Sequence, residues 1–431
     1  MVKKFTAYLL TFAAALMLFG SPSLEGRERG SNPLKLTSIS IIDRNGMNET
    51  IQTEERLQQY AKQDFLKPQP YQKVLRTYSR NNKGEVLSLI TSYYPNGQIK
   101  QYMELINKGA YGPYWEWHEG GQPKLYAFII GGMGDLGPSS EKTWLFDGTA
   151  KSWNEEGRLV CEIPYNKGVI NGTSKYYHSK GYLQKSVPLS DGKIHGLVEK
   201  FGPKGEVVES ISYVEGKRAG KTTILYPGGL KAAEEEYKDG LLLTGDYFSQ
   251  AGEKIASVRD LEGKQAVFEE GRLVEVREIR DGIPSGEVLQ YDNEGVLFIR
   301  YRTKDGLKHG EEIEYYPARK GKELRPRISL AWYKGKIQGV VKTWYENGRQ
   351  ESQREMSDNR KNGVLTAWYE DGSLMLIEEY DLDLLKKGSY FKIGDKTPVS
   401  FVRDGQGIAT FFDSHGSYLR KIHYNQGRPK E

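Results

Sequence analysis

Apolar and polar positions along the chain follow a repeating pattern that is counted from a series of glycines. Four residues before such a glycine the side chain is aromatic or aliphatic, and two and eight residues after it the chain is again mostly apolar or aromatic. The series is Gly97, Gly121, Gly157, Gly181, Gly205, Gly229, Gly252, Gly271, Gly295, Gly321, Gly348, Gly372 and Gly416, and many of its steps are 24 residues. Self-similarity at a fixed period of this length is typical of repeat architectures.

The segments around these glycines are typical of β-hairpin loops. Tripeptides such as PNG, EEG, ENG and EDG suit a three-residue loop whose glycine takes a left-handed conformation. Such a loop places the residue four before the glycine opposite the residue two after it, so Tyr93 should face Ile99. Because strand side chains alternate between faces, Ile99 and Leu105 are expected on one side. Each unit is therefore predicted to be a hairpin with one apolar face, stabilised by its neighbours.

A second glycine pattern, Gly-x-x-x-Gly, includes a segment that imitates a phosphate-binding loop, GKRAGKTT at 216–223. A nucleotide loop needs four residues between its glycines, whereas Gly216 and Gly220 enclose three and Glu215 occupies the place of the first glycine. The same frame returns without the Lys-Thr pair at 168–172, 192–196, 282–286, 306–310 and 335–339. We interpret this frame as the connecting turn between repeats.

The predicted fold is all-β: an elongated, solenoid-like array of stacked antiparallel hairpins, about 24 residues per repeat, with a small N-terminal α/β cap. We divide the chain into a signal peptide (1–23), a lead and cap (24–70) and the repeat array (71–431). The cap contains a strand at 34–42 and a helix at 53–66, with Thr53 as N-cap. Longer loops or degenerate repeats are expected at 127–150, 317–327 and 381–400.

The N-terminus predicts export. Lys3 and Lys4 precede an apolar core at 5–19, and the small residues Ser21 and Ser23 allow cleavage after Ser23. The protein is then expected in the periplasm, in the cell envelope or outside the cell. An uncleaved membrane anchor is the alternative, although the apolar core is short for a spanning helix. The only cysteine, Cys161, is expected to be a buried small apolar residue.

Composition and residue spacing give no indication of catalysis. The 62 basic and 57 acidic residues are spread along the chain, which predicts no nucleic-acid binding. A single cysteine excludes a cysteine-rich zinc site, and no serine lies in a nucleophile-elbow sequence. The histidines recur with the repeat, His118 with His178 and His195 with His309, which favours structural roles. We therefore predict no catalytic residue, metal site or cofactor, and assign the protein as a non-enzyme.

The position three before the glycine differs from its apolar neighbours. Because adjacent strand residues face opposite sides, this variable position is expected on the side away from the apolar ladders. It is the candidate surface for binding a partner. The candidate residues are Tyr94, His118, His178, Tyr226, Tyr345 and Tyr369.

The segments WYENGRQESQ, AWYEDGSLMLIEEYD, YYPNGQIKQYME and YVEGKRAGK together resemble the MORN-variant repeat. The resemblance extends over roughly residues 75–431 and lies in the register of the units rather than in any one of them. Bacterial arrays of this kind are often grouped with antitoxins of toxin–antitoxin pairs. The export signal departs from a cytoplasmic antitoxin. A second similarity is to the tyrosine–aspartate repeat of secreted shell proteins, in YDNEGVLFIRYRTKDG at 291–306.

The function predicted from these features is a non-catalytic exported scaffold that binds a protein or envelope partner through an extended β surface. The alternative is a toxin-neutralising antitoxin. Binding of phospholipid headgroups at a membrane surface through Lys and Tyr is allowed by the net charge of +5 but is less favoured. The partner and the oligomeric state stay open.

Overall fold

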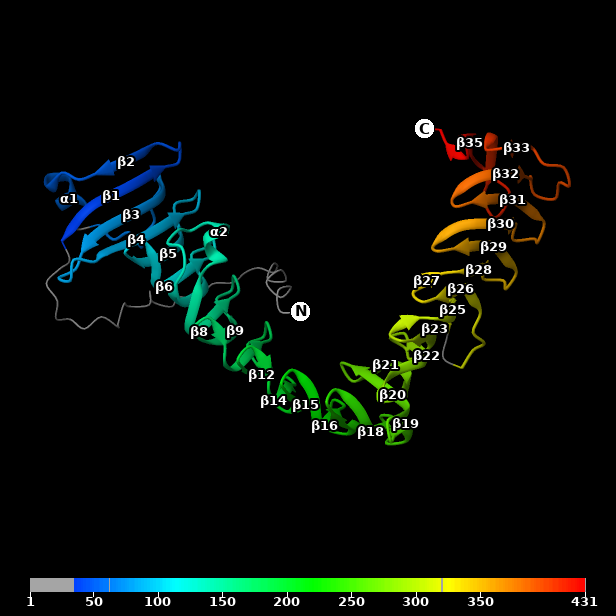
Figure 1. Cartoon of the computed structure of the whole chain (residues 1–431), viewed down its shortest axis with the longest axis horizontal. Helices are drawn as coiled ribbons and strands as arrows, with labels where there is room; N and C mark the ends of the chain where they lie inside the picture. Colours follow the sequence, from blue (N-terminus) through cyan, green and yellow to red (C-terminus); the bar gives the residue numbers. More distant parts are fainter. Residues whose placement is uncertain (1–34, 62, 319–320, 431) are drawn as a thin grey trace. The chain divides into compact units, whose positions relative to one another are not determined.

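The computed structural model describes residues 35–61, 63–318 and 321–430, so the predicted signal peptide lies outside the described residues. The chain divides into two compact units, residues 1–217 and residues 218–431, which we call unit 1 and unit 2. Helices α1 (Glu54–Tyr60) and α2 (Pro138–Glu141) lie in unit 1, and the other regular elements of the described residues are strands (Figure 1). The predicted all-β fold with a helix in the cap is confirmed. Helix α1 follows Thr53 as expected but ends well before residue 66.

Strands of unit 1 pair antiparallel in chain order, except that β1 lies between β2 and β3. The two-residue strands β10 and β13 begin hairpin strands that continue as β11 and β14. The strands are β1 (Leu36–Asp43), β2 (Asn48–Ile51), β3 (Gln72–Arg80), β4 (Val86–Tyr93), β5 (Ile99–Ile106), β6 (Gly109–Trp117), β7 (Pro123–Gly131), β8 (Leu145–Trp153), β9 (Leu159–Asn166), β10 (Val169–Ile170), β11 (Gly172–Tyr177), β12 (Leu183–Ser190), β13 (Lys193–Ile194), β14 (Gly196–Phe201) and β15 (Val207–Val214).

Strands of unit 2 also pair antiparallel with their neighbours in the chain. They are β16 (Lys217–Leu225), β17 (Lys231–Lys238), β18 (Leu241–Phe248), β19 (Lys254–Arg259), β20 (Glu262–Glu269), β21 (Arg272–Arg280), β22 (Ile283–Tyr291), β23 (Leu297–Lys304), β24 (Leu307–Lys308), β25 (Gly310–Tyr315), β26 (Pro326–Tyr333), β27 (Lys336–Ile337), β28 (Gly339–Trp344), β29 (Gln350–Ser357), β30 (Arg360–Trp368), β31 (Leu374–Asp381), β32 (Leu384–Tyr390), β33 (Ser400–Arg403), β34 (Gln406–Phe412), β35 (Tyr418–Asn425) and β36 (Arg428–Pro429).

The predicted pairing across the glycine loops is confirmed in eleven hairpins. The pairs are Tyr93–Ile99, Trp117–Pro123, Trp153–Leu159, Tyr177–Leu183, Phe201–Val207, Leu225–Lys231, Phe248–Lys254, Tyr291–Leu297, Trp344–Gln350, Trp368–Leu374 and Phe412–Tyr418. Gly271 is an exception, because it belongs to a two-residue turn in which Glu269 faces Arg272 and Leu273 faces Phe268.

The prediction that the residues two and eight after the glycine share one face is wrong for the first repeat. Ile99 packs in a cluster with Tyr93 and Tyr102, whereas Leu105 packs in a different cluster with Met103. The reason is a β-bulge, since the register shifts between Ser92 and Tyr93 next to the loop. An extra residue in one strand interrupts the alternation of side chains, so positions beyond it point to the other face. The same shift occurs beside the other glycine loops, for example between Lys200 and Phe201.

The Gly-x-x-x-Gly frame is a connecting turn followed by a strand, as the sequence indicated. Glu215 and Gly216 form a tight turn after β15 with φ values of 49° and 81°, the conformation that favours glycine in two-residue hairpins. The N–H of Gly216 donates to the carbonyl of Ile194 at 2.8 Å, which ties this turn to the preceding hairpin. Gly220 and Thr222 lie within β16 and pair with β17. This segment therefore lacks the loop that wraps a phosphate.

The core is a row of buried side chains at the centre of the sheet, where the sequence pattern gave no expectation. In unit 1, Ile90 faces Met103, and Val198 faces Ile211. Unit 2 has an equivalent row of its own, which contains Val402; this residue is 1% exposed and faces Gly388. Glu235 and Glu378 also occupy this row and are buried. Because this row mixes apolar, glycine and acidic residues, it does not appear as a hydrophobic period in the sequence.

Candidate functional site

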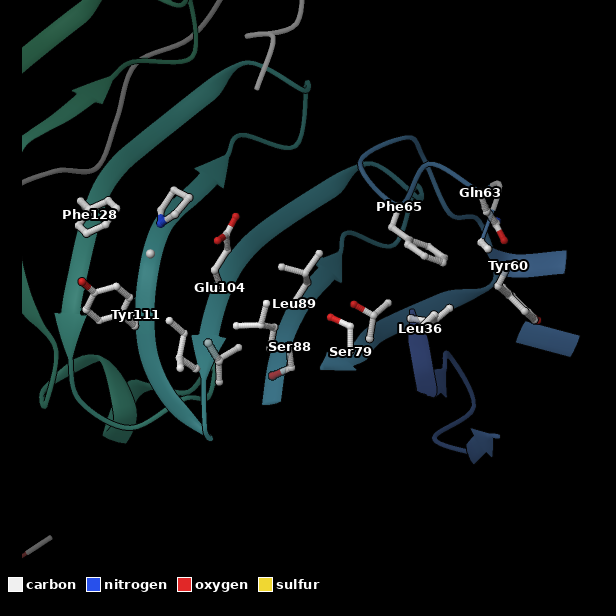
Figure 2. A pocket seen from close by; sticks show the side chains of 17 residues that line it. Leu36, Tyr60, Gln63, Phe65, Ser79, Ser88, Leu89, Glu104, Tyr111 and Phe128 are labelled. Carbon is white, nitrogen blue, oxygen red and sulfur yellow. The ribbon is translucent and has the colours of Figure 1, made fainter. Parts of the chain in front are cut away.

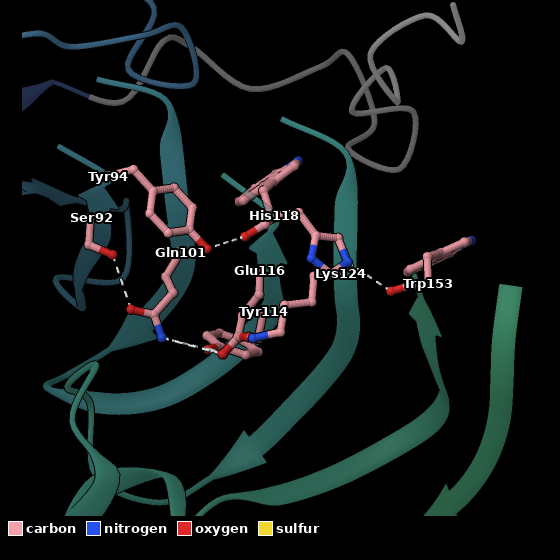
Figure 3. A network of polar contacts seen from close by, with 9 residues as sticks. Ser92, Tyr94, Gln101, Tyr114, Glu116, His118, Lys124 and Trp153 are labelled. Carbon is pink, nitrogen blue, oxygen red and sulfur yellow. Dashed lines mark hydrogen bonds and ion pairs between the residues drawn. The ribbon is translucent and has the colours of Figure 1, made fainter. Parts of the chain in front are cut away.

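The six candidate residues lie at the first position of the glycine loops, directly after a strand. The backbone of Tyr94 closes its loop by accepting a hydrogen bond from Gly97 N–H at 2.9 Å and donating to Gln98 at 2.8 Å. Its side chain leaves the loop toward the next hairpin, where the hydroxyl donates to the carbonyl of Trp117 at 2.8 Å (Figure 3).

The same contact recurs along the chain and fastens one hairpin to the next. The hydroxyls of three further candidates donate to backbone carbonyls one hairpin away, from Tyr226 to Phe248, from Tyr345 to Trp368 and from Tyr369 to Phe391, each at 2.7 Å. Nε2 of His118 lies 2.9 Å from the carbonyl of Trp153 (Figure 3). Tyr316, which the sequence analysis missed because its loop is irregular, donates to Trp344 at 2.6 Å.

His178 is the exception among the six candidates. Its Nδ1 accepts the N–H of Lys180 at 3.1 Å within its own loop. Its ring stacks on Tyr182, with ring centroids 4.7 Å apart and planes 13° apart. His178 thus stabilises its own loop instead of reaching the following hairpin.

These contacts change the expected surface role of the position. Tyr226 and Tyr369 are 5% and 0% exposed, so these two side chains are covered by neighbouring residues. Burial raises the pKa of Tyr345 and Tyr369 to about 12. These rings are buried because the short loop directs them toward the adjacent hairpin, where a backbone carbonyl without a strand partner needs a hydrogen-bond donor. A role of these residues in binding stays a prediction.

An aromatic side chain recurs on one face of unit 1 at the last strand position before each glycine loop. We call Trp117, Trp153, Tyr177 and Phe201 the aromatic row; all four are half-buried. Each pairs with the residue that starts the next strand. These four pairs recur in the same way, and in each hairpin the register shifts directly before the aromatic residue. The row continues across consecutive hairpins of unit 1. Its members are the residues four before the loop glycines, which the sequence pattern places on the apolar face of each hairpin.

Trp115 extends the row toward the strand centre in its first two hairpins. Its ring centroid lies 6.0 Å from that of Trp117 and 6.1 Å from that of Trp153, with interplanar angles of 22° and 14°. Tyr126 contacts the same indole, with centroids 4.6 Å apart. Three nearly parallel indoles therefore form a half-exposed platform.

Charged side chains lie beside the row, two residues earlier on the same strands. Nζ of Lys151 is 3.1 Å from Oε1 of Glu162, and the Tyr177 hydroxyl donates to Oε2 of Glu162 at 2.9 Å. These hydrogen bonds from Lys151 and Tyr177 lower the pKa of the Glu162 carboxyl. Lys175 pairs across the strands with Glu162 in register and is exposed. Lys151 and Lys175 thus act on one carboxylate, so these three side chains carry one positive charge in excess.

A hollow of about 410 Å³ lies on unit 1 nearer the cap. Leu89, Tyr111 and Phe128 reach it from neighbouring strands, and Glu104 stands among them (Figure 2). The Tyr102 hydroxyl donates to Oε1 of Glu104 at 2.7 Å. The lining is mainly apolar and holds Glu104 together with the polar side chains of Gln63, Thr77, Ser79 and Ser88, a composition suited to binding a ligand.

Glu235 and Glu378 are two of the three buried carboxyl groups among the described residues of unit 2. Tyr390 and Tyr380 donate to Glu378 at 2.7 and 3.0 Å. Glu235 accepts from Tyr247 at 2.7 Å in an equivalent arrangement. Burial, and then the adjacent carboxyl, raises the pKa of the Tyr247 and Tyr390 hydroxyls. The tyrosine hydroxyls thus supply the hydrogen bonds that these buried carboxyl groups need.

Among the residues that the structure describes, no group of three or more His, Cys, Asp or Glu side chains is placed to hold a metal ion. No helix of the described residues is long and apolar enough to cross a membrane. Cys161 is half-buried and has Ser152 Oγ at 3.2 Å; burial raises the pKa of its thiol.

Comparison with known proteins gives one informative match. The family model described as a MORN repeat variant matches residues 89–107, the segment that contains the first confirmed hairpin pair. No curated protein matches the sequence.

Similarity to solved structures is weak. The TcdB2-TccC3-TEV structure is 11% identical, with 89% of this chain and 24% of that chain covered and a TM-score of 0.17. The Tc holotoxin pore of Photorhabdus luminescens is 11% identical, with 89% and 28% covered and a TM-score of 0.11. A porin-like protein from Bacteroides uniformis is 8% identical, with 61% and 96% covered and a TM-score of 0.16. The chain spans about a quarter of the length of the two Tc chains, at 24% and 28%. The family similarity of the chain is thus to a MORN repeat variant, over residues 89–107.

Proposed function

We propose that this protein is a non-catalytic repeat scaffold that binds a partner protein through the aromatic row of unit 1. The observation that carries the proposal is the recurrence of a half-exposed aromatic ring in each of four consecutive glycine-loop hairpins, at Trp117, Trp153, Tyr177 and Phe201. Aromatic side chains supply large contact areas at low conformational cost and are enriched at protein interfaces.

Rigid hydrogen bonding between hairpins supports this function. Turn N–H groups tie one hairpin to the next, as from Gly192 to the carbonyl of Ile170 at 2.9 Å, and His118 adds a side-chain contact from the first hairpin of the row to the second. A surface held in this way is ordered before its partner arrives, so little entropy is lost on binding. Repeat arrays commonly use such preformed surfaces for recognition.

The experiment uses a photo-crosslinking amino acid placed at Phe201 in the full chain, expressed in its own cells. The matched control carries it at Tyr333, which is 53% exposed and lies in β26 of unit 2. One recurrent protein should be captured from position 201 and not from position 333. Capture of no protein from position 201, or equal capture from both positions, contradicts the proposal.

Export is part of the same proposal and is tested separately. Lys3, Lys4 and the apolar segment 5–19 support it. The mature protein should be found outside the cytoplasm with an N-terminus near Leu24. An intact Met1 in the soluble cytoplasm overturns export and directs the search for a partner to a neighbouring toxin.

A further inference from the structure

We propose that the aromatic row binds a proline-rich segment of the partner in the polyproline II conformation, with an acidic residue of that segment at Lys175. The inference rests on the proposed function and names the chemistry of the partner at the same surface. Its first support is the spacing of the rings. Successive members of the row, such as Trp153 and Tyr177, are separated by two strands, which corresponds to about 9.6 Å at the usual distance between paired strands.

A polyproline II helix repeats on nearly the same length. It has three residues per turn and a rise of about 3.1 Å per residue, so every third residue is about 9.3 Å from the last. A proline at every third position can therefore contact consecutive rings of the row. Because this conformation is already populated in free proline-rich chains, its binding needs little ordering.

Hydrogen-bond donors along the row fit the same occupant. A polyproline II segment has no internal hydrogen bonds, so its carbonyls need external donors. Indole N–H groups are donors only, and among the described residues none accepts a hydrogen bond from Trp117 or Trp153 Nε1. The Tyr177 hydroxyl is already directed to Glu162. The row thus offers two free donors beside apolar rings.

Charge complementarity places the acidic residue of the partner. Lys151 and the Tyr177 hydroxyl occupy the two oxygens of Glu162, at 3.1 and 2.9 Å. Lys175 is exposed and lies two residues before Tyr177 on the same strand face. Lys175 faces Glu162 in register and shares its single negative charge with Lys151, so the three side chains carry one positive charge in excess. A carboxylate next to the proline contacting Tyr177 would neutralise this excess charge.

The test measures binding of synthetic peptides to the full chain by tryptophan fluorescence and calorimetry. The probe peptide repeats a Pro-Ala-Pro triplet and carries one Asp; the control peptide has glycine in place of proline. We expect the probe to bind and the control peptide to bind at least about tenfold more weakly. Trp153→Leu should lose about tenfold in affinity, whereas Tyr333→Leu should bind as the unaltered chain does.

Lys175→Glu keeps the inference testable if Trp153→Leu misfolds, because Lys175 is exposed. This variant should weaken binding of the Asp peptide and strengthen binding of a matched peptide with Lys in place of Asp. Equal binding of the proline and glycine peptides overturns the inference. Binding of a linear oligosaccharide at Trp153, with no binding of the peptide, also overturns it in favour of a glycan platform.

The photo-crosslinking experiment separates this inference from the proposed function. If a protein is captured from position 201 and an excess of the proline peptide does not compete, the inference is wrong while the proposed function stands. If no protein is captured but the proline peptide binds with loss in Lys175→Glu, the row recognises this chemistry and the proposed cellular partner is wrong.

Discussion

The hydroxyl of Tyr345 donates a hydrogen bond of 2.7 Å to the backbone carbonyl of Trp368, which lies 23 residues further along and one hairpin away. The same bond joins Tyr94 to Trp117 and Tyr369 to Phe391. A position that looks variable in sequence thus has a common structural use, in which different side chains reach one carbonyl of the next repeat. The stability of the array depends on these contacts between neighbours as well as on each hairpin.

Tyr345→Phe should destabilise unit 2 without changing its fold. The substitution keeps the ring and removes only the hydroxyl that satisfies the carbonyl of Trp368. We expect a loss of about 1 kcal/mol in the free energy of unfolding, the usual net value of such a hydrogen bond. Urea denaturation measures it. Tyr333→Phe, at an exposed site, is the control and should change the midpoint little; equal losses in both variants would contradict the role of the bond.

Alkaline conditions should weaken the same contacts. Burial raises the pKa of Tyr345 and Tyr369 to about 12, whereas a tyrosine in the unfolded chain has a pKa of about 10. The unfolded chain loses its protons first, so this contribution is complete below about pH 10 and disappears as the pH passes about 12. In urea titrations across this window, stability should fall less steeply with pH in Tyr345→Phe than in the unaltered chain. Parallel curves would show that Tyr345 does not contribute.

The sequence predicted the hairpins and their loop pairing because both depend on local chemistry. A left-handed glycine such as Gly97 and the apolar residues beside it determine that Tyr93 faces Ile99. The faces were wrong beyond the loop because one bulge, at Ser92 and Tyr93, reverses every later position. Bulges leave little trace in a pattern of residue types.

For a related reason, the sequence alone could not predict which aromatic side chains of the candidate site are covered and which are exposed. Phe201 was expected among the apolar ladder positions and Tyr226 on the side away from them, yet Tyr226 is 5% exposed and Phe201 is half-buried. Which aromatic is covered depends on the neighbouring hairpin, and this contact joins residues more than 20 positions apart, as in the Tyr226–Phe248 bond with its separation of 22. Periodicity identifies the set of aromatics but not the side on which each lies.

Gly407→Ala should be far more damaging than a glycine substitution in an open loop. Gly407 has a φ of +140°, and a Cβ there would overlap the carbonyl oxygen of Phe401 and lie 3.0 Å from Cα of Val402. Because the obstacle is backbone, we expect a cost above about 2 kcal/mol. Gly372→Ala, at φ +92° with no atom within 4 Å of the added Cβ, isolates the strain of the backbone alone. Thermal unfolding of both variants makes the comparison, and a smaller effect at Gly407 would show that β33 and β34 can separate.

The buried pair Glu378 and Tyr390 should act as one unit. Glu378 is 4% exposed and accepts hydroxyl hydrogen bonds from Tyr390 at 2.7 Å and Tyr380 at 3.0 Å. In Glu378→Gln, an NH2 group replaces one oxygen, so one of the two tyrosine hydroxyls has to accept a hydrogen bond instead of donating one. Tyr390→Phe removes one donor and leaves the carboxyl with the other. A double-mutant cycle in urea should therefore give a coupling of about 1 kcal/mol, the usual net value of such a hydrogen bond.

The equivalent pair in the same unit provides the control for this cycle. Glu235 accepts from Tyr247 at 2.7 Å and also from Gln265 at 2.6 Å, so it keeps a second donor of a different kind. Tyr247→Phe should therefore cost less than Tyr390→Phe, because Gln265 still satisfies the same oxygen of Glu235. If Tyr247→Phe and Tyr390→Phe are equally destabilising and neither couples to its carboxyl, the cost comes from packing of the rings, and the buried carboxyl groups are tolerated without stabilising the sheet.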